Sequence, residues 1–169
     1  KHPNLKIIIG SILDDNLMEP IIKEVDEVYH LASAVGVKLI MDQPVETIEN
    51  IFEGTAVVFR YAARYRKKVL LTSTSEVYGK NKNVPFKEDY DRIEGPTSSH
   101  RWAYASAKSL DEFLALAHSK KSGLAVVVVR LFNTVGPRQS SQYGMVIPNF
   151  IEAALKGETL YVYGDGEQT

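Results

Sequence analysis

Short apolar runs alternate along this chain with longer segments in which apolar residues recur every three or four positions. The short runs predict buried strands, and the longer segments predict amphipathic helices. We expect strands at 5–9, 27–31, 69–72, 124–131 and 159–163. We expect helices at 17–23, 45–65, 101–119 and 146–156. Continuous apolar strands separated by helices are typical of a parallel sheet covered on both faces, which is an α/β architecture.

The helix expected at 101–119 has a recognisable apolar side and a recognisable end. Leu110, Phe113, Leu114 and Ala117 share that side, and Gly123 follows as a cap. Gly157 is expected to close the helix at 146–156 in the same way.

Polar residues gather where the predicted strands end. Ser73, Thr74, Ser75 and Glu76 follow one strand, and Asn133 follows another. Ligands of parallel sheets bind at the carboxyl ends of the strands, so these residues form a candidate site. The connection 73–100 is unusually long for a compact domain, and we expect it to wall that site.

Tyr104 and Lys108 are four residues apart on a predicted helix, so they share one face. A cation beside a phenol favours the phenolate, and we therefore expect Lys108 to lower the pKa of Tyr104. A tyrosine tuned in this way can exchange a proton with an alcohol at neutral pH. Thr74 can hydrogen-bond the same alcohol.

Composition narrows the possible partners. The 169 residues include 20 basic and 21 acidic side chains, which gives no reason to expect binding to nucleic acid or to a charged membrane surface. No apolar run approaches the length of a membrane span. There is no cysteine, which excludes disulfides and thiolate metal sites. We expect a cytoplasmic protein without a metal site.

The glycine-rich fingerprint G-x-G-x-x-G, which opens dinucleotide-binding folds, does not occur in the sequence. The chain also starts within the first strand pattern and stops without a final helix. We therefore expect an internal piece of a longer protein.

Several motifs together identify a family resemblance. The chain resembles the extended short-chain dehydrogenase/reductases that modify nucleotide sugars, namely epimerases, 4,6-dehydratases and UDP-glucuronate decarboxylases. The segments that carry the resemblance are Gly10-Ser11-Ile12, His30-Leu31-Ala32-Ser33-Ala34, Thr74-Ser75-Glu76-Val77-Tyr78-Gly79, Tyr104 with Lys108, 130–138 and 162–166.

The resemblance implies a Rossmann-type, doubly wound parallel sheet in three α/β/α layers. The first βαβ unit and most of the C-terminal substrate lobe would be missing. Residues 1–140 would then be a partial NAD-binding domain, and 141–169 the start of the substrate lobe. It also implies a homodimer formed through the helices at 45–65 and 101–119.

The resemblance assigns residues to NAD and to a nucleotide-sugar substrate. His30 itself is expected to be a hydrogen-bonded residue at a strand end. Ser11 stands where the family has an aspartate that contacts adenine. The residues assigned to the cofactor are Ser11, Ile12, Leu31, Ala32, Ser33, Ser73, Tyr104 and Lys108. Those assigned to the substrate are Asn133, Arg138, Asn149, Tyr161 and Tyr163.

The implied reaction begins with oxidation of the sugar at C4, and the catalytic residues are Thr74, Ser75, Glu76, Tyr104 and Lys108. Dehydratases of the family usually carry Asp-Glu where this chain has Ser75-Glu76, which counts against dehydration. UDP-glucuronate decarboxylation and UDP-sugar 4-epimerisation stay open at nearly equal weight. The alternatives are a 4,6-dehydratase and a non-catalytic NAD-binding protein on the same fold.

Overall fold

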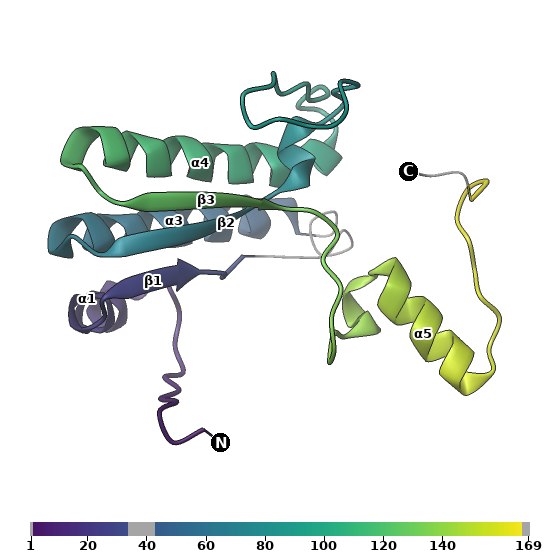
Figure 1. Ribbon diagram of the computed structural model, residues 1–169, viewed down its shortest axis with the longest axis horizontal. Helices are drawn as coiled ribbons and strands as arrows, with labels where there is room; N and C mark the ends of the chain where they lie inside the picture. Colours follow the sequence, from purple (N-terminus) through teal and green to yellow (C-terminus); the bar gives the residue numbers. More distant parts are fainter. Residues whose placement is uncertain (1, 34–42, 167–169) are drawn as a thin grey trace.

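A three-stranded parallel sheet organises the fold (Figure 1). The computed structural model describes residues 2–33 and 43–166, without the side chain of Tyr143. The strands are β1 (Glu27–His30), β2 (Lys68–Thr74) and β3 (Val126–Leu131), in the order β1-β2-β3. Both pairings are parallel, with Val28 opposite Val69 and Val69 opposite Val126. The predicted parallel α/β architecture is confirmed.

Four α-helices lie within residues 2–33 and 43–166, before, between and after these strands. They are α1 (Asp15–Glu24), α3 (Pro44–Tyr65), α4 (Ala103–Ser122) and α5 (Val146–Lys156). Gly123 and Gly157 cap α4 and α5 in the left-handed conformation, as predicted. None of the helices in the described ranges is long and apolar enough to cross a membrane.

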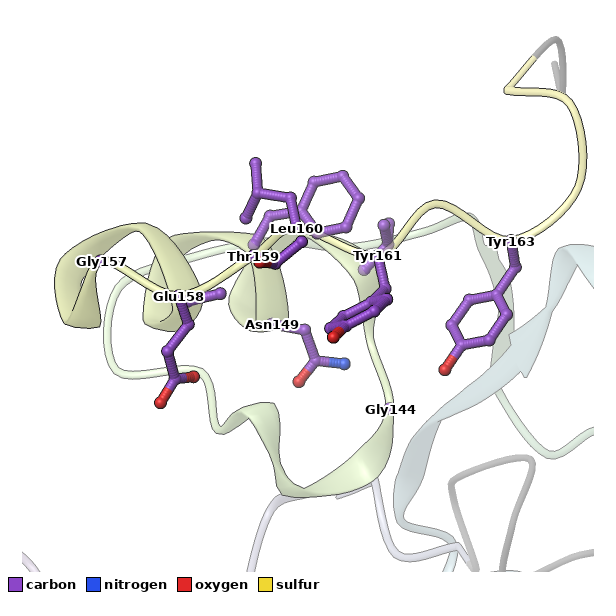
Figure 2. Close-up of a pocket in the computed structure, with 11 residues that line it drawn as sticks. Gly144, Asn149, Gly157, Glu158, Thr159, Leu160, Tyr161 and Tyr163 are labelled. Carbon is purple, nitrogen blue, oxygen red and sulfur yellow. The ribbon is translucent and has the colours of Figure 1, made fainter.

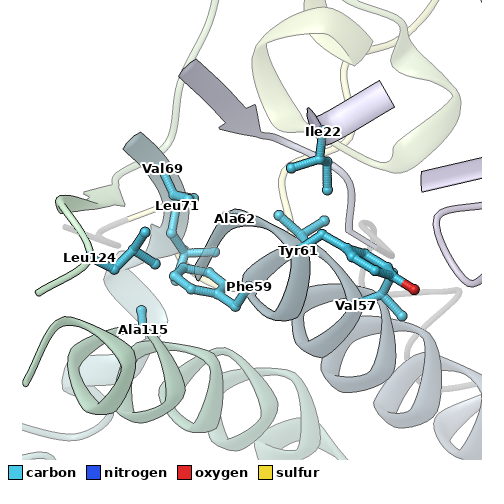
Figure 3. Close-up of a cluster of buried hydrophobic side chains, with 10 residues drawn as sticks. Ile22, Val57, Phe59, Tyr61, Ala62, Val69, Leu71, Ala115 and Leu124 are labelled. Atoms are coloured by element: carbon cyan, nitrogen blue, oxygen red, sulfur yellow. The ribbon is translucent and has the colours of Figure 1, made fainter. Parts of the chain in front are cut away.

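The core lies between the sheet and the helices α3 and α4 (Figure 3). Val69 and Leu71 of β2 point into it because alternate side chains of a strand share a face. There they meet Phe59 of α3 and Ala115 of α4, while Ile22 of α1 extends the cluster. Tyr29 and Val127 point away from this core and are 63% and 58% exposed.

Two predicted strands do not form. Residues 5–9 and 159–163 are irregular, and Ile9 and Tyr163 are 96% and 87% exposed. A strand needs a neighbour to pair its backbone N–H and C=O groups, and neither segment pairs with a strand in the described part of the chain. Apolar composition alone was therefore a misleading signal at both places.

Helix α4 packs with the side opposite to the apolar side noted in the sequence. Leu110, Phe113 and Ala117 are exposed. The buried residues of α4 are small or polar, namely Ala105, Ala107, Lys108, Ser109, Asp111, Glu112 and Ala115. Small side chains let α4 approach α3 closely, and the polar ones enter the candidate site.

Aromatic contacts fix the connection that follows β2. It contains the short 3₁₀ helix η1 (Ser75–Tyr78) and leads to η2 (His100–Trp102). The ring of Tyr78 stacks on Phe86 with centroids 4.6 Å apart, and the Arg130 guanidinium of β3 lies over the same Tyr78 ring, 4.8 Å from its centroid. A backbone bridge between Gly79 and Ile93 closes the connection. It is therefore an ordered wall beside the strand ends.

Candidate active site

Tyr104, Lys108 and Asp111 follow one another along a single face of α4. The spacing of four and then three residues places them on adjacent turns. The Lys108 side chain is 2% exposed, and its Nζ donates a hydrogen bond to Asp111 Oδ2 at 3.0 Å. Asp111 is itself fully buried. The ammonium that the sequence assigned to Tyr104 is thus paired with a carboxylate that the sequence analysis did not identify.

The Tyr104 phenol lies half-buried between groups from two other segments. Burial raises its pKa most, and the negative charges of Glu76 and Asp111 raise it further. A hydrogen bond with Ser33 opposes this rise. The expectation that Lys108 lowers the pKa of Tyr104 is wrong in this structure, because burial disfavours the phenolate and Asp111 takes the Lys108 charge.

The turn after β2 presents Glu76 at the strand end. Thr74 is the N-cap of η1, and its Oγ1 accepts a hydrogen bond from the Glu76 backbone N–H at 3.2 Å. Ser75 and Glu76 are half-buried in this turn. Ser33, Glu76 and Tyr104 therefore come together from three separate parts of the chain.

The Ser73 side chain faces α4. Its Oγ donates to Glu112 Oε1 at 2.5 Å. The same carboxylate receives the Arg130 guanidinium at 3.0 Å from Nε and 2.7 Å from Nη2. Glu112 thus links α4 to both β2 and β3. The Ser73 hydroxyl, which the sequence analysis assigned to the cofactor, donates its hydrogen bond to Glu112 in this structure.

His30 closes the buried side of the site. Its Nε2 lies 2.9 Å from Thr55 Oγ1 of α3, which confirms the expected hydrogen-bonded residue at a strand end. Burial first, and the Lys108 charge second, lower the pKa of His30 to about 4. Leu31 and Ala32, which follow it, are exposed at the end of β1.

The Ser11-Ile12 segment leads into the turn that precedes α1. Ser11 is exposed, and its Oγ accepts a hydrogen bond from the Leu13 backbone at 3.1 Å. Ile12 packs on Gly54 of α3, where a Cβ would lie only 2.2 Å from Ile12 Cδ1. No described contact joins either residue to Tyr104.

Three of the substrate residues line one hollow of about 660 Å³ (Figure 2). Asn149 comes from α5, while Tyr161 and Tyr163 come from the segment after it. Figure 1 shows α5 to one side of the sheet, so this hollow is separate from the Tyr104 cluster. Arg138 lines another hollow of about 480 Å³, and Asn133 is exposed after β3.

Sequence reasoning missed Asp111, Thr55 and Glu112. The signal for Asp111 was available, because it lies one helical turn beyond Lys108 on the predicted reactive face. Thr55 belongs to the apolar face of α3 and gave no such signal. Glu112 is identified only through its tertiary partners, Ser73 and Arg130.

Comparison with known proteins identifies the family to which the chain is similar. The model of the NAD dependent epimerase/dehydratase family matches residues 1–169. UDP-N-acetyl-alpha-D-glucosaminuronate decarboxylase of Bacillus cytotoxicus is 49% identical over 98% of this chain and 51% of its own length. The structure of UDP-N-acetylglucosamine 4-epimerase from Methanobrevibacter ruminantium, in complex with UDP-N-acetylmuramic acid, matches with a TM-score of 0.90 and 35% identity. The match covers 99% of this chain and 53% of that one.

A third similar protein was solved with the cofactor bound. The dTDP-glucose 4,6-dehydratase of Bacillus anthracis, in complex with NAD, has a TM-score of 0.80 and 30% identity, over 98% of this chain and 49% of that one. The chain thus spans about half the length of these three proteins. The match to the family model extends over the whole sequence, and the chain belongs to the NAD-dependent epimerase/dehydratase family, whose cofactor is NAD.

Proposed function

We propose that the full-length protein decarboxylates a UDP-linked uronic acid through a 4-keto-sugar intermediate. The observation that carries this proposal is the position of Glu76, which follows the end of β2. Its negative charge raises the pKa of the Tyr104 phenol on α4. A carboxyl group beside the proton-transferring tyrosine suits a reaction that moves a proton beyond C4. The 49% identity to a decarboxylase of a UDP-linked uronic acid supports the same choice.

The residues at the strand ends fit NAD. An ammonium has three donors, and of the described residues only Asp111 accepts a hydrogen bond from Lys108. A buried donor with spare capacity suits the hydroxyl groups of a ribose. Ser33, Leu31 and Ala32 offer a polar group and exposed apolar surface beside it. Bound there, NAD would supply the hydride acceptor for oxidation at C4 and the hydride donor for the final reduction.

The chain's own residues then move protons and orient the sugar. Tyr104 Oη, in its phenolate form, takes the proton of the C4 hydroxyl, and Thr74 with Ser75 orients that hydroxyl. The C4 ketone makes the substrate a β-keto acid, so the C5–carboxylate bond breaks and its electron pair is delocalised onto the ketone oxygen. Carbon dioxide leaves, and Glu76 passes to C5 a proton that it takes up from solvent water, which leaves Glu76 ionised again. Tyr104 finally returns its proton to the C4 oxygen.

The hollow on α5 is assigned to the nucleotide. Tyr161 and Tyr163 offer aromatic faces for a base, and Asn149 offers an amide that reads its polar edge. Asn133 and Arg138 are assigned to the diphosphate and sugar. Residues 1–140 would then act as the cofactor domain and 141–169 as the start of the substrate lobe.

A homodimer through α3 and α4 belongs to the same proposal. Leu110, Phe113 and Leu116 of α4 form an exposed apolar side, which is typical of an interaction surface. Light scattering of the full-length protein should give the mass of two chains, and Phe113→Glu should give one. A mass of one chain for the unmodified protein would contradict the dimer.

The second candidate function is 4-epimerisation of a UDP-sugar. It is favoured by the high structural similarity to UDP-N-acetylglucosamine 4-epimerase. An epimerase exchanges only a hydride and a proton at C4, and Tyr104 with Thr74 would suffice for that.

One assay separates the two candidates. The full-length, NAD-loaded protein is incubated with UDP-glucuronate, UDP-N-acetylglucosaminuronate and UDP-glucose, and products are followed by mass. Loss of carbon dioxide from either uronate is expected. Conversion of UDP-glucose to an isomer of equal mass, with both uronates unchanged, would replace decarboxylation by epimerisation. No reaction with any of them would reject both candidates.

A further inference from the structure

A buried polar cluster lies behind Tyr104 and Lys108, and it draws on three elements. Asp111 of α4 holds the Lys108 ammonium, Thr55 of α3 lies near the Asp111 carboxylate, and His30 of β1 bonds Thr55. Lys108 and Asp111 are 2% and 0% exposed. Asp111 Oδ1 has no hydrogen-bond partner among the described residues. The reaction steps given above use neither Asp111 nor Thr55.

A buried, incompletely paired carboxylate is an expensive feature. Removing an ionised group from water costs several kcal/mol, and only a good partner offsets this. Burial accordingly raises the pKa of Asp111, and the adjacent Lys108 and Thr55 oppose that rise. Asp111 also determines how much of the Lys108 charge acts on its neighbours, because opposite charges 3.0 Å apart largely cancel at longer range.

We propose that Asp111 is a positioning residue that acts through Lys108: it is the counter-ion that holds the ammonium in place and limits the positive charge that reaches the Tyr104 phenol. The inference rests on the proposed function in one respect, namely that Tyr104 is the base. It goes beyond that function because it assigns the pH range of the reaction to a residue outside the reacting groups.

The effect of the Asp111 charge on Tyr104 can be separated from the effects of the other groups around this cluster. Glu76 of η1 also faces Tyr104, and it is kept in the variants below. His30 of β1 has a pKa lowered to about 4, so it is neutral near pH 7. Thr55 of α3 hydrogen-bonds His30, and the Glu112 charge, which also acts on Asp111, is paired with Arg130 of β3.

The test replaces Asp111 by asparagine in the full-length, NAD-loaded protein. Asparagine keeps the shape and removes the negative charge, so Lys108 acts on Tyr104 unopposed. The phenol then loses its proton at lower pH, and the acid limb of the pH–rate profile should move down by about one pH unit. The ultraviolet titration of tyrosinate, taken as the difference from the same variant carrying Tyr104→Phe, should move in the same direction.

A control variant separates local from general charge effects. Asp15 of α1 is exposed and pairs with Arg60, so Asp15→Asn removes a carboxylate far from Tyr104 and should leave both readouts unchanged. If Asp111→Asn does not fold, the smaller neutral variant Asp111→Ser replaces it in the same measurements.

The outcomes distinguish this inference from the proposed function. A downward shift in both readouts supports the counter-ion role. Unshifted readouts, even with a lower rate, would overturn it and leave Asp111 a structural residue only. An active Tyr104→Phe enzyme rejects the base assignment itself, whereas an inactive one with an unshifted Asp111→Asn variant rejects the counter-ion alone.

Discussion

The His30 imidazole and the Thr55 hydroxyl join the end of β1 to the middle of α3 through one buried contact of 2.9 Å. Burial, together with the nearby Lys108 charge, lowers the pKa of His30 from 6.5 to about 4. The folded protein therefore holds a neutral imidazole at a pH where the unfolded chain holds a charged one.

This difference predicts that stability falls on acidification. Between pH 6.5 and about 4 the unfolded chain binds the extra proton, so the free energy of unfolding decreases over that window and levels off below it. The whole effect is about 3 kcal/mol. Urea unfolding of the full-length protein, at neutral pH and near the folded pKa, should show a smaller loss for His30→Gln than for the unmodified protein. Equal losses would show that His30 does not titrate in this way.

Removing the Tyr104 hydroxyl should abolish sugar oxidation. Loss of a positioned base costs about 10²–10⁴-fold in rate. Phenylalanine keeps the ring and therefore the fold, so circular dichroism of Tyr104→Phe should be unchanged. Lys108→Met should weaken NAD binding, measured by calorimetry, as well as the rate. Tyr29→Phe is the matched control, because Tyr29 is an exposed tyrosine whose hydroxyl donates a hydrogen bond to Glu27, and it should keep full activity.

Glu76 separates the two candidate reactions. If the protein is a decarboxylase, Glu76→Gln should lower the rate by about 10²–10⁴-fold, because the proton for C5 is lost. If it is a 4-epimerase, the same change should cost little. The exposed Glu88, in the same connection, gives the control variant Glu88→Gln, with no effect expected. A fully active Glu76→Gln decarboxylase would remove Glu76 from the mechanism.

Gly79 lies in the connection after β2, where its backbone pairs with that of Ile93, and we expect that it does not tolerate a side chain. Its φ is 61°, and a Cβ would lie 2.2 Å from the Ile93 carbonyl oxygen. We expect Gly79→Ala to lower the free energy of unfolding by about 3 kcal/mol, from backbone strain and the clash. Gly123→Ala has a similar φ of 67° but open space around it, and should cost about 1 kcal/mol. Equal losses in denaturant unfolding would mean that the clash is relieved.

The sequence was sufficient for features with a local cause. The helix ends at Gly123 and Gly157 follow from a residue that accepts the left-handed conformation, and the strands β1, β2 and β3 follow from apolar runs. Features that depend on which residues the fold brings together were not predictable from the sequence. Residues 5–9 look like a strand but have no paired neighbour in the described part of the chain, and Lys108 looks like the partner of Tyr104 until Asp111 is placed beside it. The roles assigned to residues in catalysis, cofactor binding and substrate binding, including those of Ser11, Ser75, Asn133 and Arg138, all stay predictions.

The charged inner side of α4 limits how this protein can change over evolutionary time. Glu112 and Arg130 are 9% and 16% exposed and meet through two oxygens, so losing either one leaves the other charged and nearly dry, at a cost of about 3–5 kcal/mol. A neutral pair of similar volume would avoid that cost. Substitutions at positions 112 and 130 should therefore occur together in related sequences.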